Sequence, residues 1–98
     1  MDLVVEPEAE RDLKQFDTEY QSYILKRLKE LEENPASHEG CDTIQVKGRP
    51  VFKYVMKQGS RGGKDFRAIY DILDSEIRVI AIFHRDKGYD KEEISERF

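Results

Sequence analysis

Three consecutive runs between residues 51 and 85 are rich in β-branched and aromatic residues, and they limit the fold more than any other part of the chain. The runs span residues 51–57, 66–73 and 77–85. Clusters of Gly, Asp or Ser bound each run, which is typical of strands joined by turns. Because strand side chains alternate between two faces, each run has one mostly apolar face. The sequence therefore predicts three neighbouring strands that need a covering layer.

The first 35 residues supply this layer. Leu3-Val4-Val5 is typical of a short strand, and Pro7 with its acidic neighbours suits the beginning of a helix. Thr18, with Gln21 in the position of a capping box, begins a second helix that ends at Asn34-Pro35. The apolar stripes of the helices are Ala9, Leu13, Phe16 and Tyr20, then Tyr20, Ile24, Leu28 and Leu31. We expect an antiparallel helical hairpin packed on one face of the sheet.

Chain length allows one hydrophobic core, so we expect residues 1–98 to form a single α+β domain. Residues 36–50 are polar and are interpreted as a connection with a brief extended piece at residues 44–46. Cys41 is the only cysteine, which favours a reducing, cytoplasmic location. No apolar run approaches the roughly 18 residues that a membrane span requires, so no membrane partner is expected.

Charge is distributed unevenly along the chain, whose net charge is −4. Residues 44–89 hold 10 Lys and Arg against 5 Asp and Glu, whereas residues 1–43 hold 5 against 12. A cationic surface on an acidic body can meet phosphate at a specific site, although bulk attraction to nucleic acid is weak. The pattern directs attention to the basic residues of the three strands.

Strict alternation places Lys53, Arg67 and Arg85 on the sheet face opposite to the helices. In the third strand it also places Ile77, Val79, Ala81 and Phe83 on the face of Arg85. The basic side chains are either a joint site or solvated charges that pair with acidic neighbours, namely Asp65, Asp71 or Asp86. Charge patterning alone leaves both interpretations open.

Several short motifs together resemble the RelE/ParE superfamily of bacterial and archaeal toxins. They are the run Asp65-Phe66-Arg67-Ala68-Ile69-Tyr70, a turn, an apolar strand, then His84-Arg85 and Tyr89. In that family, a strand of the form Y-R-x-x-Y precedes a strand ending in H-R or K-R, with a tyrosine shortly after. The helical hairpin ending at Asn34-Pro35 also matches, so the likeness covers essentially the whole chain. It implies a β-α-α-β-β-β order, with a small, curved, mostly antiparallel sheet packed against the N-terminal hairpin.

The resemblance implies a toxin of a type II toxin–antitoxin system, with a cognate antitoxin protein as partner. RelE-like members cleave messenger RNA in the ribosomal A site, which would make the ribosome and mRNA further partners. ParE-like members inhibit DNA gyrase and are not nucleases, and a third alternative is an inactive member that acts as a protein-binding module. The RelE-like interpretation is favoured because five residues of the family's site coexist here: Lys53, Arg67, His84, Arg85 and Tyr89.

The resemblance also implies a role for each of these residues. Arg67 and Arg85 match the phosphate-stabilising arginines, and Lys53 matches an active-site lysine. Tyr89 is similar to the tyrosine that orients or deprotonates the 2′-hydroxyl, and His84 is a candidate general acid or base near neutral pH. RNA contacts are expected from Lys57, Arg61 and Lys64. Cleavage by a neighbouring 2′-hydroxyl needs no metal, so no metal or cofactor is expected.

One departure from the family pattern concerns the first strand. Val55 stands where one branch has a second active-site lysine.

Overall fold

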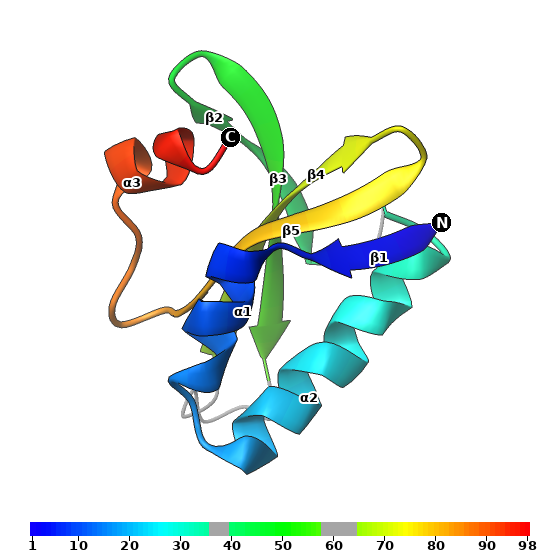
Figure 1. Ribbon diagram of the computed structural model, residues 1–98, viewed down its shortest axis with the longest axis vertical. Coiled ribbons are helices and arrows are strands. Elements are labelled where there is room, and N and C mark those ends of the chain that lie inside the picture. The colour runs from blue at the N-terminus through cyan, green and yellow to red at the C-terminus, as the bar shows by residue number, and fades with distance from the viewer. Residues whose placement is uncertain (36–39, 58–64) are drawn as a thin grey trace.

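A five-stranded sheet with the strand order β1-β5-β4-β3-β2 forms the centre of the fold (Figure 1). The computed structural model describes residues 1–35, 40–57 and 65–98. The strands are β1 (Asp2–Val5), β2 (Cys41–Val46), β3 (Arg49–Lys57), β4 (Asp65–Leu73) and β5 (Glu76–His84). The helices are α1 (Pro7–Lys14), α2 (Thr18–Lys29), a 3-10 turn at Glu30–Glu32 and α3 (Lys91–Glu96). Only β1 and β5 pair in parallel among the described strands, so the mostly antiparallel α+β fold is confirmed.

Helices α1 and α2 cover one face of the sheet, as the apolar spacing predicted. Ile24, Leu28 and Leu31 are fully buried against a layer that includes Tyr54 and Tyr70 of the sheet. The predicted capping box is wrong, although the helix begins at Thr18. Asp17 is the N-cap residue without a capping side-chain bond, and the Gln21 amide instead donates to the Phe16 carbonyl oxygen at 2.8 Å. None of the described helices is both long and apolar enough to cross a membrane.

One element was predicted too short and another was absent from the sequence-based prediction. Residues 41–46 form an edge strand paired with β3, so the extended piece expected at residues 44–46 is confirmed and the interpretation of residues 41–43 as a connection is wrong. Residues 91–96 form α3, whose Ile94 is buried on the sheet face opposite to α1 and α2. This second core cluster consists of Val46, Val51, Ile69, Ala81 and Ile94. The opposite face is therefore partly covered rather than fully open.

A register shift in β5 corrects the predicted alternation of its side chains. Ile69 of β4 lies opposite Ala81, but the next residue, Tyr70, lies opposite Val79. The extra residue, Ile80, reverses the faces, because side chains alternate with a period of two. Val79 consequently belongs to the core under α1 and α2, whereas Ala81 belongs to the core under α3. The prediction that these two residues share one face is wrong.

The buried hydroxyl of Tyr70 makes the fold sensitive to alkaline pH. It donates to the Pro35 carbonyl oxygen and lies 3.1 Å from the Cys41 sulfur. Burial raises the pKa of Tyr70 well above the ordinary tyrosine value. Since the folded state then holds this proton more tightly than the unfolded state, its contribution to stability is complete below pH ~10 and is lost above it.

We therefore expect the free energy of unfolding to fall above pH ~10, by up to about 1.4 kcal/mol per pH unit for this group. Urea unfolding at a series of pH values measures the slope. Tyr70→Phe should reduce the slope and cost about 1 kcal/mol at neutral pH through the lost hydrogen bond. Some slope should remain, because burial also raises the pKa of Tyr54 and of Cys41. An identical slope in Tyr70→Phe would contradict this assignment.

Candidate functional site

Strand register brings the predicted basic residues onto one face of the sheet, opposite to α1 and α2. Arg67 of β4 lies between Val55 of β3 and Phe83 of β5. Lys53 lies opposite Ile69, two residues from Arg67, so Lys53 and Arg67 are diagonal neighbours about 7–8 Å apart by strand geometry. This placement agrees with the alternation expected for β3 and β4.

Asp65 lies between the two candidate arginines. The Arg67 Nε is 3.5 Å from Asp65 Oδ1, and the Arg85 Nη1 is 3.8 Å from Asp65 Oδ2. The Asp65 side chain is 1% exposed, whereas those of Arg67 and Arg85 are 24% and 59% exposed. The structure thus brings the two arginines together around one buried carboxylate. The charge pattern left open whether the basic residues pair with acidic neighbours, and Arg67 and Arg85 do pair with Asp65.

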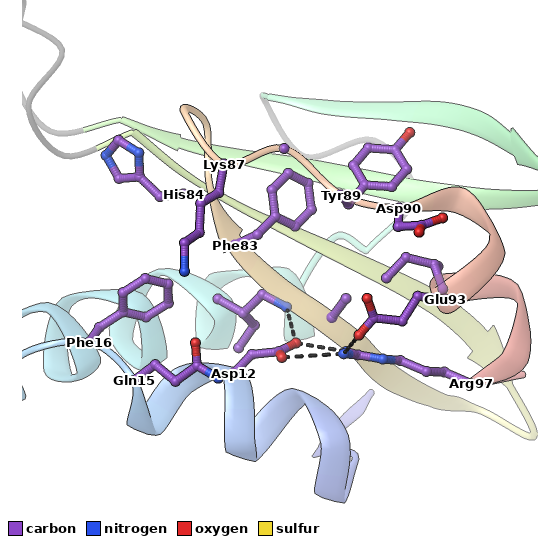
Figure 2. Close-up of a pocket in the computed structure, with 14 residues that line it drawn as sticks. Asp12, Gln15, Phe16, Phe83, His84, Lys87, Tyr89, Asp90, Glu93 and Arg97 are labelled. Carbon is purple, nitrogen blue, oxygen red and sulfur yellow. Dashed lines mark hydrogen bonds and ion pairs between the residues drawn. The ribbon is translucent and has the colours of Figure 1, made fainter.

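Tyr89 reaches the same row of residues through an aromatic contact. Its ring centroid is 5.0 Å from that of Phe83, with the rings inclined at 49°. Phe83 is the residue opposite Arg67, so Tyr89 lies at the β5 side of the basic face. Figure 2 shows the two rings next to each other, with Tyr89 contributed by the segment between β5 and α3.

His84 lies on the other face of the sheet. Its ring makes an edge contact with Phe66, a core residue beneath α1 and α2, with centroids 5.3 Å apart. The His84 Nδ1 accepts a hydrogen bond of 3.1 Å from the Asp86 backbone amide. The structure therefore separates His84 from the row that holds Arg67. Its predicted role in acid–base chemistry stays a prediction.

The three predicted RNA-contact residues lie at or beyond the ends of β3 and β4. Lys57 is placed opposite Asp65 by the strand register. Arg61 and Lys64 lie outside the described residues. Their roles stay predictions.

A pocket of about 230 Å³ opens between α1, β5 and the segment that leads into α3. The walls include Phe16, His84, Lys87 and Tyr89. Asp12 and Arg97 also line the pocket, and Figure 2 shows them joined by dashed lines. The pocket lies where β5 continues past β1, whose pairing with β5 ends at Val79. Beyond Val79, side chains of α1 and of residues 87–97 line the space beside β5. The pocket therefore lies at the junction between α3 and the rest of the fold.

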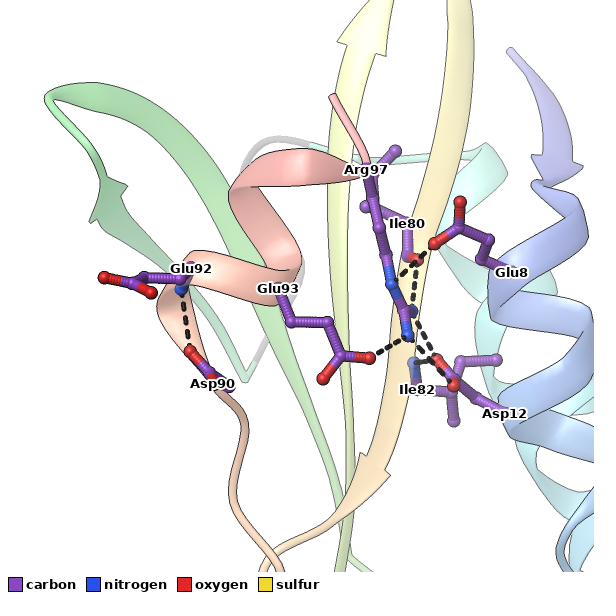
Figure 3. Close-up of polar contacts among 8 residues, drawn as sticks. All are labelled: Glu8, Asp12, Ile80, Ile82, Asp90, Glu92, Glu93 and Arg97. Carbon is purple, nitrogen blue, oxygen red and sulfur yellow. Dashed lines mark hydrogen bonds and ion pairs between the residues drawn. The ribbon is translucent and has the colours of Figure 1, made fainter.

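Arg97 closes this junction with several bonds (Figure 3). Its guanidinium donates to both Asp12 oxygens at 2.7 and 3.3 Å, to the Ile80 carbonyl oxygen at 3.0 Å and to Glu93 at 3.0 Å. Arg97 Nε also lies 3.0 Å from a Glu8 oxygen. The hydrogen bond to Asp12 raises the pKa of Arg97 above its already high ordinary value, so the residue is a permanent cation. Arg97 thereby joins α3 to α1 and β5.

The chemistry available on the basic face is the binding of a phosphate group by fixed cations. Arg67 and Arg85 approach the same carboxylate, and Lys53 lies on the same face of the sheet. No cluster of three His, Cys, Asp or Glu that could hold a metal is present among residues 1–35, 40–57 and 65–98. Sequence reasoning treated Asp65 as one of three interchangeable acidic neighbours and missed its burial. The signal was its position directly before Phe66, two residues from Arg67 on the same strand face.

The family model described as the ParE toxin of a type II toxin–antitoxin system, parDE, matches residues 3–89. The chain belongs to this toxin family. The membership confirms the RelE/ParE superfamily that the motifs indicated. No curated protein matches this toxin's sequence.

Solved structures of RelE toxins are similar to this toxin in fold. A double mutant of E. coli RelE in the free state has a TM-score of 0.64 at 18% identity, covering 98% of this chain and 90% of the other. The RelBE2 toxin–antitoxin complex of Mycobacterium tuberculosis gives 0.65 at 16% identity, with coverages of 86% and 96%. The intact E. coli RelBE complex gives 0.58 at 20% identity, with coverages of 83% and 92%. At these identities the likeness shows the shared fold.

Proposed function

We propose that this toxin is an endoribonuclease that cleaves messenger RNA on the ribosome and so inhibits translation. The observation that supports it best is the approach of Arg67 and Arg85 to one buried carboxylate, at 3.5 and 3.8 Å, on the face that also holds Lys53. Cations gathered around one point suit a reaction in which negative charge grows on a phosphate. The partly exposed guanidinium groups can reach a ligand from solvent.

Cleavage by the neighbouring 2′-hydroxyl needs these groups and no metal. The 2′-oxygen loses its proton and forms a bond to phosphorus, while the bond from phosphorus to the 5′-oxygen breaks and that oxygen takes up a proton. The products are a 2′,3′-cyclic phosphate and a 5′-hydroxyl. Arg67 and Arg85 stabilise the extra charge on the phosphoryl oxygens, Lys53 adds a third cation, and the Tyr89 hydroxyl orients the 2′-hydroxyl.

His84 contributes less than the arginines in this proposal. Its ring packs on Phe66, on the face of the sheet that α1 and α2 cover. His84 also lines the pocket beside β5 with Lys87 and Tyr89, and from this side it would approach the bound RNA. A group on that side can serve the leaving oxygen as a proton donor.

A cognate antitoxin is the proposed protein partner, in the cytoplasm where ribosomes act. The solved relatives include RelB–RelE complexes from two bacteria, E. coli and Mycobacterium tuberculosis. An antitoxin that lies over the basic face would keep RNA away from Arg67 and Arg85.

Inhibition of DNA gyrase is the second candidate function. The matching family model is described as the ParE toxin, and ParE-like members act on gyrase. A toxin of that kind would use the same scaffold and would not depend on Arg85 or Tyr89.

A paired assay separates the two candidates. Purified toxin is added to a cell-free translation reaction, in which the 5′ ends of the message are mapped, and to a gyrase supercoiling reaction. We expect cuts in phase with codons and undiminished supercoiling. Intact messages with blocked supercoiling would identify a gyrase inhibitor, and no effect in either reaction would contradict both candidates.

A further inference from the structure

We propose that Asp65 is a positioning residue, which holds Arg67 and Arg85 as a pair for an incoming phosphodiester. The inference deepens the proposed function and rests on it. Asp65 has no direct part in the bond changes and acts through the two guanidinium groups.

Burial makes Asp65 a fixed anchor. Its side chain is 1% exposed, and a carboxylate in such a position is stable only beside positive charge. Among the side chains that the structure describes, Arg67 and Arg85 are the cations within 4 Å of it. The Asp65 carbonyl oxygen also accepts a 2.9 Å hydrogen bond from the Arg85 backbone amide, so Asp65 holds Arg85 through both its side chain and its main chain.

The contacts of Arg67 and Arg85 with Asp65 are short enough for electrostatic attraction and longer than direct hydrogen bonds. Charge-assisted hydrogen bonds are about 2.7–2.9 Å long, whereas these two contacts are 3.5 and 3.8 Å. Neither Asp65 oxygen receives a hydrogen bond from the described residues. Arg67 meets Asp65 through Nε, and Arg85 meets it through Nη1. Each guanidinium therefore keeps N–H donors for a second acceptor such as a phosphoryl oxygen.

Without the carboxylate, the two guanidinium groups would repel each other. Both groups lie within 4 Å of the Asp65 carboxylate, so two positive charges are held close together. The negative charge between them offsets their repulsion. The nearby Asp86 cannot replace it, because that side chain is 86% exposed and lies against His84. Asp71 is a second acidic residue on β4 with a different partner, Arg49, at 2.6 Å. It serves as a matched control, since its ion pair is at the other end of the strand.

The first test measures order and needs no activity. The ¹⁵Nε–H signals of Arg67 and Arg85 are assigned by NMR, and their relaxation is compared in the wild type, Asp65→Asn and Asp71→Asn. We expect Asp65→Asn to lower the order parameters of both groups, whereas Asp71→Asn should leave them unchanged. Equal order in Asp65→Asn and the wild type would overturn the proposal, whatever the toxin's activity proves to be.

The second test separates binding from chemistry. Asp65→Asn removes a negative charge beside the RNA, so a ribosome-bound message with a 2′-deoxy group at the scissile position should bind the variant at least as tightly as it binds the wild type. The kcat for the ribose form should nevertheless fall at least 10-fold, because the cations are no longer held in place. A general loss of folded protein would lower both quantities together.

A double variant tests whether Asp65 acts through the arginines. Since Asp65 acts through the arginines, Asp65→Asn should lower kcat much less in an Arg85→Ala background than in the wild type. Full additivity of the two losses would overturn the proposal. A wild type that leaves ribosome-bound messages intact would refute the nuclease function, and the relaxation measurements would still decide whether Asp65 orders the pair.

Discussion

Replacement of Arg85 by alanine should lower the rate of RNA cleavage by about 10²–10³-fold, the loss of about 2.7–4 kcal/mol that follows removal of one donor aimed at a developing oxyanion. Arg85 is 59% exposed, and its side-chain ion pair with Asp65 is long at 3.8 Å, so the fold should tolerate the change. Arg67→Ala should have a similar effect. Single-turnover cleavage in a translation reaction measures the loss, and expression of either variant should no longer arrest growth.

Arg49→Ala provides the matched control for this experiment. Arg49 is an arginine of comparable exposure on the adjacent strand β3, paired with Asp71 rather than with Asp65. It should therefore retain cleavage within about threefold. Toxicity that survives both Arg67→Ala and Arg85→Ala would refute the nuclease function and favour the gyrase candidate.

Replacement of Arg97 by alanine should destabilise the protein by roughly 2–4 kcal/mol, because it leaves Asp12 without its cation and the Ile80 carbonyl without its donor. The guanidinium is only 11% exposed, so solvent cannot substitute for the bonds that it makes. Loss of these bonds should release α3 before the rest of the fold unfolds. Chemical denaturation measures the free energy, and hydrogen exchange should show faster exchange at the amides of residues 91–97.

Glu93→Gln is the control for the Arg97 experiment. Glu93 is 62% exposed, and ion pairs of such residues contribute about 0–1 kcal/mol. The variant should therefore change stability little. Unchanged exchange in α3 of Arg97→Ala would show that Ile94 alone holds the helix on the sheet.

The parts of the fold that follow one simple period could be predicted from the sequence. Helices α1 and α2 have unbroken stripes, and β3 and β4 alternate without interruption, so their cores were assigned correctly. The bulge in β5 could not be predicted, because an extra residue such as Ile80 changes the faces without altering the local composition. The bulge is visible in the pairing of β5 with β4, which exists only in the folded sheet.

Strand β2 and helix α3 had weaker signals that were present in the sequence. The turn Lys47-Gly48, with φ angles of 49° and 80°, is the two-residue connection of a hairpin and implies a strand before β3. Asp90, whose side chain accepts from the Glu92 amide, precedes an acidic first turn in the pattern of a helix start. Both elements are short and mostly polar on their outer sides, so propensity alone favoured coil.

The sequence predicted which face of the sheet carries the basic residues of the candidate site, but it did not predict the contacts between their side chains. Alternation correctly grouped Lys53 with Arg67, since both lie on regular strands. The place of Asp65 beside Arg67 on β4 was visible in the sequence, but its burial, with 1% of the side chain exposed, is a property of the folded sheet. For His84, alternation indicated the opposite face, and the resemblance to a family motif outweighed that indication.

The parallel pairing of β1 with β5 has a consequence for the order in which the protein assembles. Residues 2–5 are synthesised near the beginning, yet their hydrogen-bonding partners at residues 76–79 follow more than 70 positions later. Contacts of such long range form late and slow the folding of small domains. A growing polypeptide therefore carries an unpaired first strand until its last strand has been made, and a product that stops before residue 76 has nowhere to place it.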